Sequence, residues 1–296
     1  MEIQALQTFL AVIDEGGVLA ASKALHTVQS NVTSRIKRLE QELGTELFYR
    51  SGRGLELSPS GRELAKHARE LIQMEKLASL AVKEVGYNRG EIRIGTMETF
   101  ASYRLPLALK ELRKAHPGIQ IKIETNTSQT LINKVLQHKL DCAFIGGHYE
   151  NPALSTDEVL VEELVLVRAK HDQNPDTPLM LFREGCTYRD RALQWQSLYG
   201  KQTQEILELG TLDGILGCVS VGLGLTLMPS WVVESSRFRD ELIIERVPKS
   251  LALVPTLMIC HQRETDLAAL TTLRQAVIGQ GISKPHSVET QQSAVA

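Results

Sequence analysis

The apolar residues between positions 20 and 44 recur at the spacing of a helix. Val32, Ile36, Leu39 and Leu43 fall at i, i+4, i+7 and i+11, so they share one face. The opposite face, at about 100° per residue, carries short hydrogen-bonding and basic side chains: Ser30, Ser34, Lys37 and Gln41. A helix with one buried and one such polar face can enter the major groove of DNA, and the alternative is an ordinary surface helix.

Further helices and a hairpin are predicted on both sides of this stretch. Leu6, Phe9, Leu10 and Ile13 repeat at helical spacing and predict a first amphipathic helix. Gly16-Gly17 ends this helix. A small-residue helix over 20–25 follows, and then the helix that begins at Gln29. Strands 47–50 and 55–58, joined by a turn at 51–54, form a hairpin after it. Three helices followed by a hairpin describe a winged helix-turn-helix.

A long helix is predicted directly after the hairpin. Ser58 supplies a capping side chain and Pro59 suits the first helical position, and no further breaker occurs until Gly86 apart from Gly61 in the first turn. The helix would carry a partial apolar stripe: Leu64, Ala68, Leu71, Ile72, Leu80 and Val85. Because the small N-terminal domain cannot cover the whole stripe, we expect the helix to pair with its copy in a second chain.

The remaining residues alternate between strand and helix patterns. The first part of this region reads as strand 91–95, helix 105–115, strand 118–125, a helix ending at 138, and strand 140–146. This alternation predicts a parallel sheet with right-handed crossovers. A crossover strand over 159–168 would enter a second lobe and another, over 251–261, would return from it. Two α/β lobes place a ligand in the cleft between them, at the carboxyl ends of strands.

These patterns divide the chain into four parts. We expect a winged helix-turn-helix at 1–58, a linker and dimerisation helix at 59–88, a two-lobed α/β domain at 89–282, and a polar, disordered tail at 283–296. Within the two-lobed domain, lobe I spans about 91–161 and 262–282, and lobe II about 162–261. The fold class is therefore α+β and multidomain.

Charge and hydropathy narrow the class of protein. The net charge of the 296-residue chain is −2, so binding to nucleic acid would need a local cluster of cations. Residues 1–60 hold six Lys or Arg, and five of them lie between Arg35 and Arg53, on the polar helix and the hairpin. No apolar run is long enough to span a membrane and no signal peptide is evident, which predicts a cytoplasmic protein without a membrane partner.

Catalytic and metal-binding patterns are missing from the sequence. The four cysteines form no CxxC pair and have no histidine at ligand spacing, so neither a metal site nor a disulfide framework is expected. No Ser-His-Asp order, P-loop or GxGxxG after a strand is present. We therefore predict that the protein is not an enzyme and carries no cofactor.

The N-terminal pattern resembles the DNA-binding domain of LysR-type transcriptional regulators. The matching residues are Phe9-Leu10-Ala11-Val12, Ala20-Ala21, Ala24-Leu25-His26, Val28-Gln29-Ser30, Ser34-Arg35-Ile36, Leu39-Glu40, Leu43-Gly44, Leu47-Phe48, Arg50 and Leu57-Ser58-Pro59-Ser60-Gly61. Two departures are Gly17-Val18-Leu19, where the family has a Ser-Phe-Thr type of segment, and Asn31, where many members have proline or alanine. Both could alter the preference for DNA sequence.

The resemblance implies a set of DNA contacts on the polar helix and the hairpin. Base edges would be met by Gln29, which can bind adenine through two hydrogen bonds, with Ser30, Thr33 and Ser34 assisting. Arg35 and Lys37 would contact the DNA backbone or the bases. Arg50 would contact a phosphate, and Arg53 would enter the minor groove. Alternatively, Arg50 could brace the hairpin and Arg35 could pair with a nearby acid.

The C-terminal region resembles the effector-binding domain of the same family, which is itself similar to periplasmic solute-binding proteins. Hydroxyl pairs follow its first two strands, Thr96 with Thr99 and Thr127 with Ser128, and both precede a helix whose N–H groups favour an anion. N-capping without a ligand is the competing interpretation. Gly146 would permit close approach of an effector, and Tyr188 could close the cleft from the second lobe. Glu98 would repel an anionic effector unless it points away.

Cys186 suggests a second possible mode of regulation. Its surroundings resemble the region around the reactive cysteine of peroxide-sensing family members, and Arg183, Arg189 and Arg191 could lower the pKa of its thiol. However, Trp195 stands where a resolving cysteine is expected. A pocket-lining or buried cysteine is the alternative to redox sensing.

Together these patterns predict a ligand-responsive, sequence-specific DNA-binding transcriptional regulator with a small-molecule effector of unknown identity. Expected partners are promoter DNA, the effector and a second copy of the chain, and the resemblance adds a tetramer and RNA polymerase. Two alternatives remain: a redox-responsive regulator that uses Cys186, and a solute-binding protein fused to an unrelated helical module.

Overall fold

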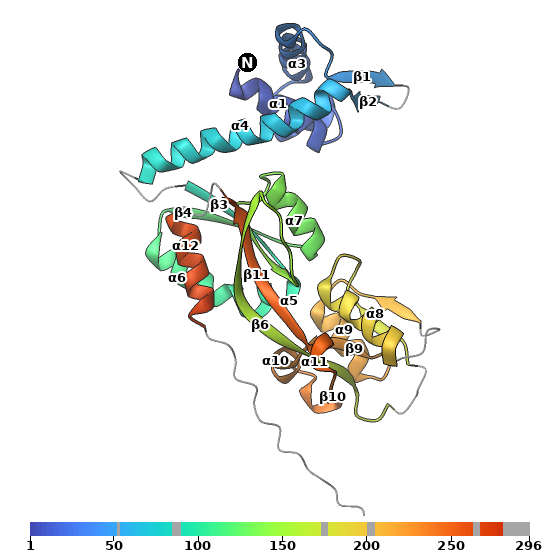
Figure 1. Cartoon of the computed structure of the whole chain (residues 1–296). Helices are drawn as coiled ribbons and strands as arrows, with labels where there is room; N and C mark the ends of the chain where they lie inside the picture. Colours follow the sequence, from blue (N-terminus) through green and yellow to red (C-terminus); the bar gives the residue numbers. More distant parts are fainter. Residues whose placement is uncertain (52–53, 85–89, 173–176, 200–204, 263–266, 281–296) are drawn as a thin grey trace, which may run out of the picture. The chain divides into compact units, whose positions relative to one another are not determined.

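The computed structural model describes residues 1–51, 54–84, 90–172, 177–199, 205–262 and 267–280. The chain separates into two compact units, which Figure 1 shows in the colours of the sequence. The first unit comprises Met1–Glu91 together with the short segments Gly118–Gln120 and Leu136–Leu140, and the second comprises the rest. The predicted tail at 283–296 lies outside the described residues.

The first unit contains the predicted winged helix-turn-helix. Its elements are α1 (Ile3–Asp14), α2 (Val18–Ala24), α3 (Gln29–Leu43), β1 (Phe48–Ser51), β2 (Gly54–Leu57) and α4 (Pro59–Glu84). Gly16 and Gly17 adopt φ of 75° and 154°, which a side chain would disfavour, and so separate α1 from α2. Phe9, Val32 and Leu39 are almost fully buried where the three helices meet. The apolar spacing of the sequence thus predicted both the helices and their core.

The hairpin and the start of α4 are joined by the side chain of Ser58. Its Oγ donates a hydrogen bond to the Glu46 carbonyl at 2.7 Å and accepts one from the Gly61 N–H at 2.9 Å. Pro59 is the first helical residue, so the predicted cap and start are confirmed. β1 and β2 pair antiparallel, and residues 52–53 of the predicted turn lie outside the described part.

Only part of the apolar stripe of α4 is covered by the first unit. Leu64, Ala68 and Ile72 pack against the core of α1 and α3. Leu71 and Met74, on the other side of the helix, stay 41% and 46% exposed. The side chains of Leu80 and Val85, which belong to the predicted stripe, are outside the described residues.

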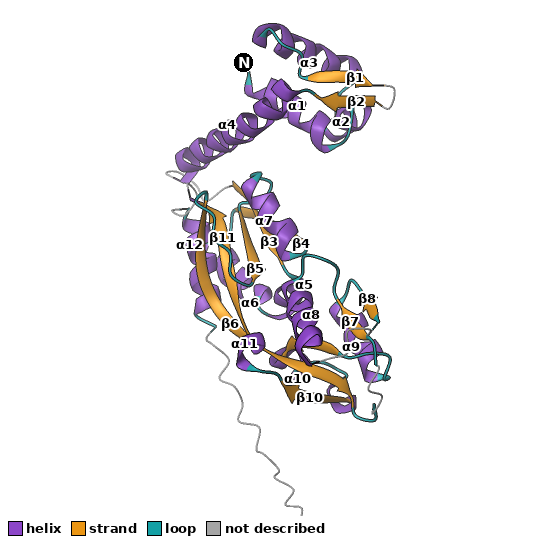
Figure 2. Ribbon diagram, turned by 45° about the vertical axis from the view of Figure 1, so that its right-hand side comes forward, coloured by secondary structure: helices purple, strands orange, loops and turns teal. Residues whose placement is uncertain are grey.

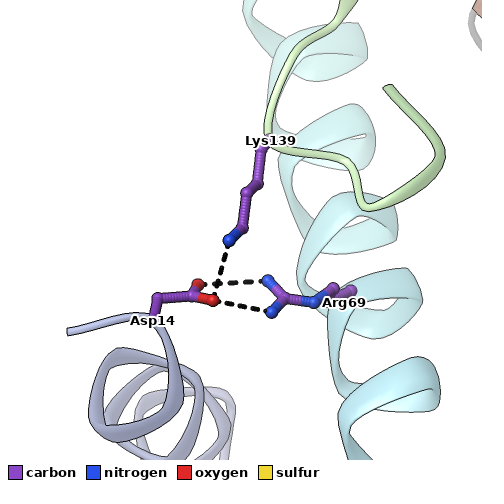
Figure 3. Close-up of polar contacts among 3 residues, drawn as sticks. All are labelled: Asp14, Arg69 and Lys139. Atoms are coloured by element: carbon purple, nitrogen blue, oxygen red, sulfur yellow. Dashed lines mark hydrogen bonds and ion pairs between the residues drawn. The ribbon is translucent and has the colours of Figure 1, made fainter. Parts of the chain in front are cut away.

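Asp14, at the end of α1, is held by two cations (Figure 3). Its carboxylate accepts hydrogen bonds from both terminal nitrogens of Arg69 on α4, at 2.8 and 3.1 Å, and one from Lys139 at 2.8 Å. Burial alone would raise the pKa of Asp14, but the hydrogen bonds and positive charges of Arg69 and Lys139 outweigh it, and the pKa lies below its usual value. This bidentate contact fixes α1 against α4.

A seven-stranded sheet runs through the second unit, in the order β10-β6-β11-β5-β3-β4, with β9 also paired to β6. The strands are β3 (Gly90–Thr96), β4 (Ile119–Thr125), β5 (Cys142–Gly146), β6 (Leu154–Ala169), β9 (Thr226–Pro229), β10 (Leu242–Arg246) and β11 (Leu253–His261). β3 and β5 pair in parallel as predicted, whereas β11 is antiparallel to both β5 and β6. The chain leaves the first half along β6 and returns along β11, so these long strands run in opposite directions (Figure 2). The predicted parallel pairing is confirmed for β3 and β5, and the two crossover strands β6 and β11 add antiparallel pairs to the sheet.

Helices cover both halves of this sheet. Those of the first half are α5 (Glu98–Tyr103), α6 (Leu105–Ala115), α7 (Ser128–Leu136) and α12 (Ala268–Ile278). Those of the second half are α8 (Thr187–Tyr199), α9 (Leu212–Ser220), α10 (Ser230–Glu234) and α11 (Lys249–Ala252), with a 3-10 turn at Arg239–Glu241 and a parallel pair, β7 (Leu179–Leu181) and β8 (Ile206–Glu208). Phe144 is buried in the first half, with its ring stacked on Phe100 at 4.4 Å. None of the described helices is long and apolar enough to cross a membrane.

Candidate functional site

The predicted polar face of α3 is open to solvent. Gln29, Ser30, Ser34 and Lys37 are exposed, and Thr33 is half-buried. On the opposite face Val32, Ile36 and Leu39 are at most 7% exposed, whereas Leu43, at the end of the helix, is 40% exposed. The helix ends at Gly44, whose φ of 67° favours glycine. This arrangement presents hydrogen-bonding groups outward from a firmly packed helix.

The predicted cations are placed differently from one another. Arg35 is half-buried and its Nη1 donates to Thr8 Oγ1 on α1 at 3.4 Å, so it braces the two helices rather than pairing with an acid. Lys37 has no hydrogen bond or ion pair within the described part of the chain. The side chain of Arg50 and all of Arg53 lie outside that part. Lys37 is thus the predicted cation of α3 that remains available to a phosphate.

A cavity that is partly open to solvent lies in the second unit. It is lined by Met97, Glu98, Thr99, Thr125, Asn126, Thr127, Ser128, Phe182, Arg183, Cys186, Thr187, Tyr188 and Gly210. These residues follow the ends of β3, β4, β7 and β8. A cavity at the carboxyl ends of strands is a common place for a small-molecule site in α/β folds.

Four of the six predicted effector contacts line this cavity: Thr99, Thr127, Ser128 and Tyr188. The other two are close by but are not part of its lining. Thr96 is fully buried and donates to the Met97 carbonyl at 3.2 Å. Gly146 uses its backbone, since its N–H donates to Ser128 Oγ at 3.0 Å and its carbonyl accepts from Thr187 Oγ1 at 2.8 Å.

Several lining residues were missed by the sequence analysis: Met97, Thr125, Asn126, Phe182, Thr187 and Gly210. All of them lie within a few residues of a strand's carboxyl end. The signal that could have found them is the rule that ligands bind at those ends, applied to every residue beside the ends of β3 and β4 and also to the ends of β7 and β8.

The two halves meet beside the cavity. The Gln129 N–H, in the first turn of α7, donates to the Gly185 carbonyl at 3.4 Å. Gly185 has a φ of 83°, and a Cβ there would lie 2.9 Å from Thr127 Oγ1. Glycine is therefore needed at 185 both for its backbone conformation and for the close approach of the halves.

Behind the cavity a buried carboxylate holds Tyr188. Glu162 on β6 is 2% exposed, and its carboxylate accepts hydrogen bonds from the Tyr188 hydroxyl, from Trp231 Nε1 at 3.2 Å and from Thr256 Oγ1 at 3.3 Å. Burial raises the pKa of Glu162, although these donors oppose the shift. The Tyr188 hydroxyl also lies 3.3 Å from Thr99 Oγ1, so this network connects the crossover strands to the cavity lining.

The pKa of the Cys186 thiol is raised, whereas the sequence predicted that the nearby arginines would lower it. Burial raises that pKa and outweighs the opposing effect of Arg189. Arg189 donates to the Phe182 carbonyl at 2.7 Å, and Arg191 donates to the Ser250 carbonyl at 3.1 Å. A thiol that stays neutral is a poor nucleophile, which disfavours the redox alternative and leaves Cys186 as a cavity-lining residue.

Comparison with known protein families gives two matches that together span most of the chain. A family model described as "Bacterial regulatory helix-turn-helix protein, lysR family" matches residues 3–62. A second, described as "LysR substrate binding domain", matches residues 86–281. The matches cover the polar helix in one case and the cavity in the other.

Curated relatives extend over nearly the full length. The HTH-type transcriptional regulator SoxR of Arthrobacter sp. is 36% identical over 272 residues, which cover 90% of this chain and 93% of that protein. The HTH-type transcriptional regulator GltR of Bacillus subtilis is 36% identical over 266 residues, 88% of this chain and 90% of that protein.

Solved structures share the fold. A full-length OxyR variant from Pseudomonas aeruginosa superposes with a TM-score of 0.72 at 19% identity, covering 94% of both chains. Full-length CbnR, in a crystal structure with its target DNA, gives a TM-score of 0.62 at 20% identity, covering 95% of this chain and all of CbnR.

Proposed function

The chain belongs to the LysR family of DNA-binding transcriptional regulators, and from this premise we propose that α3 reads promoter DNA under the control of a small molecule in the cavity. The observation that carries the proposal is the polar face of α3. Gln29, Ser30, Ser34 and Lys37 are all exposed on a helix whose other face is buried. A helix of this kind can place side chains against base edges in the major groove.

The proposed contacts differ in what they recognise. Gln29 can hydrogen-bond adenine through its amide, with Ser30, Thr33 and Ser34 beside it. Lys37 meets a phosphate, a contact that adds affinity without sequence preference. For the hairpin we propose that Arg50 meets phosphate and Arg53 enters the minor groove. Arg35 contributes mainly by holding α3 against α1.

A second copy of the chain is the proposed partner of α4. Leu71 and Met74 are exposed on the side of α4 that does not pack on α1. Pairing with the same helix of another chain would cover them and present two α3 helices to two half-sites. A tetramer, contact with RNA polymerase and a cytoplasmic location are further proposals that follow from the family.

We propose that the effector acts through the two halves of the second unit. Segments from both halves line the cavity, and β6 and β11 connect them. A ligand that binds one arrangement of the halves more tightly than another would shift the population toward it. In this proposal the DNA-binding domain spans 1–58, the linker helix 59–88 and the effector domain 89–282. The chain crosses from lobe I to lobe II near residue 161 and returns near residue 262.

The test is selection of genomic DNA fragments by the purified full-length protein, followed by footprinting with and without a metabolite extract. We expect two protected half-sites whose centres are separated by whole helical turns of about 10 bp, and a footprint that changes with the extract. Failure to enrich any sequence would contradict the proposal.

A variant of Lys37 separates phosphate contact from base reading. Lys37→Gln is expected to weaken binding to all DNA sequences alike and to lower the slope of log affinity against log salt by about 1. Lys110→Gln, on the exposed surface of α6, is the matched control and should leave the slope unchanged. A slope equal to that of the unmodified protein for Lys37→Gln would remove this residue from the interface.

A further inference from the structure

Two side chains of opposite charge line the cavity without pairing. Glu98 is half-buried at the start of α5, and Arg183 is exposed after β7. Neither charged group forms an ion pair or a hydrogen bond within the described residues, whereas the nearby Arg189 and Arg191 do. Gly210 leaves room for Arg183, because a Cβ there would lie 3.1 Å from its Nη2. The cavity thus offers one free anion and one free cation to its occupant.

Thr99 adds a hydrogen-bond acceptor beside Glu98. The Tyr188 hydroxyl donates its single proton to the Glu162 carboxylate. The hydrogen bond between Thr99 and Tyr188, 3.3 Å long, must then use the proton of Thr99. The Thr99 oxygen keeps only lone pairs for a ligand. The side chains of residues 98 and 99 therefore present only acceptors to the cavity.

Ser128 adds a donor to the same cavity as Arg183. Its Oγ accepts the Gly146 N–H at 3.0 Å, so its own proton remains for another acceptor. Ser128 also opens α7, where the helix dipole favours an anion, and the guanidinium of Arg183 can only donate. These two groups therefore present donors to a ligand.

We infer that the effector is a small amphoteric molecule that carries both a cationic donor, such as an ammonium group, and an anionic acceptor, such as a carboxylate. The cationic group would face Glu98 and Thr99, and the anionic group would face Ser128 and Arg183. A simple anion would leave the half-buried Glu98 carboxylate without a counter-charge. A simple cation would leave the exposed Arg183 without a partner in the cavity. This inference rests on the proposed function, in which the cavity is the effector site.

A matched panel tests the inference on the full-length protein. It contains the protein amino acids, the carboxylic acids that result when their α-amino group is replaced by hydrogen, and the amines that result when their carboxyl group is replaced by hydrogen. Binding is followed by the thermal unfolding midpoint, which rises with a ligand selective for the folded state. We expect at least one amino acid to raise the midpoint well above both of its counterparts at equal concentration.

Two neutralising variants assign the charges. Loss of one charge-assisted contact lowers affinity about tenfold to a hundredfold. Glu98→Gln should therefore lower the affinity for the amino acid by that factor and leave the affinity for its deaminated acid unchanged. Arg183→Gln should lower the affinity for the amino acid by the same factor and leave the affinity for the decarboxylated amine unchanged. Glu111→Gln and Arg113→Gln, on the exposed surface of α6, are the matched controls and should change neither affinity.

Three outcomes overturn the inference, and they are separable from failure of the proposed function. A deaminated acid that binds as tightly as its amino acid, with no effect of Glu98→Gln, shows a plain anion site and leaves the proposed function intact. A panel without any response, alongside a footprint that still changes with metabolite extract, contradicts the inference and leaves the proposed function intact. A footprint indifferent to every addition contradicts both.

Discussion

The polar face of α3 comes from one continuous helix, whereas the cavity of the second unit is assembled from segments that follow four different strands. On α3 the side chains proposed to bind are exposed, and Lys37 has no partner among the described residues. In the cavity most hydroxyls are already hydrogen-bonded to one another or to the backbone, as Thr99 is to Tyr188 and Thr187 is to Gly146. A rigid surface suits a partner of constant shape such as DNA. A partly open cavity lined by two halves that contact each other suits a ligand that changes how those halves meet.

The largest expected loss of stability comes from truncating one buried aromatic side chain in the core of either unit. Phe9→Ala removes a fully buried ring from the first unit, and Phe144→Ala does the same in the second. Each should cost about 3–5 kcal/mol of unfolding free energy, because a cavity remains where the ring stood. We expect Phe9→Ala to abolish DNA binding while ligand-induced thermal stabilisation persists, and Phe144→Ala to have the reverse effect.

Urea unfolding, a DNA-binding titration and a ligand titration on both variants check this expectation. Loss of both functions in each variant would mean that the two units unfold as one, and the comparison between them would then have to be abandoned.

A smaller effect is expected at Gly185, beside the cavity. Gly185→Ala forces a side chain into the left-handed region and against Thr127, with an expected cost of about 1–3 kcal/mol and weaker ligand binding. Gly222→Ala is the control, because Gly222 has a similar φ of 81° but open space around its Cβ position. Equal ligand affinities in the two variants would show that the contact between Gly185 and Thr127 is irrelevant to binding. Calorimetric titration and thermal melts measure the difference.

Glu162 links the stability of the second unit to pH. Its pKa is raised above the usual 4.5, so the folded protein keeps this proton to a higher pH than the unfolded chain. The associated stability is complete below pH 4.5 and disappears as the pH rises through the folded pKa. Glu162→Gln removes this titration. The variant should be less stable than the unmodified protein by about 1 kcal/mol, because its amide makes imperfect hydrogen bonds. This difference in unfolding free energy should be larger at pH 5 than at pH 8.

Glu158→Gln, at an exposed position on the same strand, is the control for this measurement and should not change with pH. A deficit for Glu162→Gln that is the same at both pH values would contradict the assigned titration.

The smallest effect is expected at Asp14 in the first unit. Its lowered pKa means that the pairing with Arg69 and Lys139 stabilises the fold above pH 3.8 and is lost as the pH falls through the folded pKa. Asp14→Asn should cost about 1 kcal/mol at pH 7 and nothing near pH 2. Urea midpoints at the two pH values, with the exposed Glu15→Gln as control, provide the check. If Asp14→Asn lowered the unfolding free energy equally at pH 7 and pH 2, the shape of this side chain rather than its charge would matter at this contact.

The same comparison explains how far the sequence could predict this protein. The face of α3 and the start of α4 depend on local spacing and capping, which the sequence contains in full, as Val32, Ile36 and Ser58 show. Glu162 could not be predicted, because a glutamate within a strand is normally solvated. Its burial and its three donors come from α8, α10 and β11, which only the tertiary fold brings together.

The sheet shows the same limit. The alternation of strands and helices predicted the parallel pair β3 and β5, but the antiparallel return of β11 depends on where the chain goes after the second half. The elements α5, β10, α10 and α11 were not predicted either, because each is short and lacks a clear period.

The most direct test of DNA reading by α3 is the affinity of Gln29→Ala for the selected promoter site, measured beside Gln7→Ala. Gln7 is equally exposed but lies on α1, so its variant makes the same chemical change away from the proposed base contacts. We predict that Gln29→Ala loses about 1–3 kcal/mol of binding free energy on the specific site and little on unrelated DNA, while Gln7→Ala binds like the unmodified protein. Unchanged affinity and sequence preference in Gln29→Ala would contradict the account.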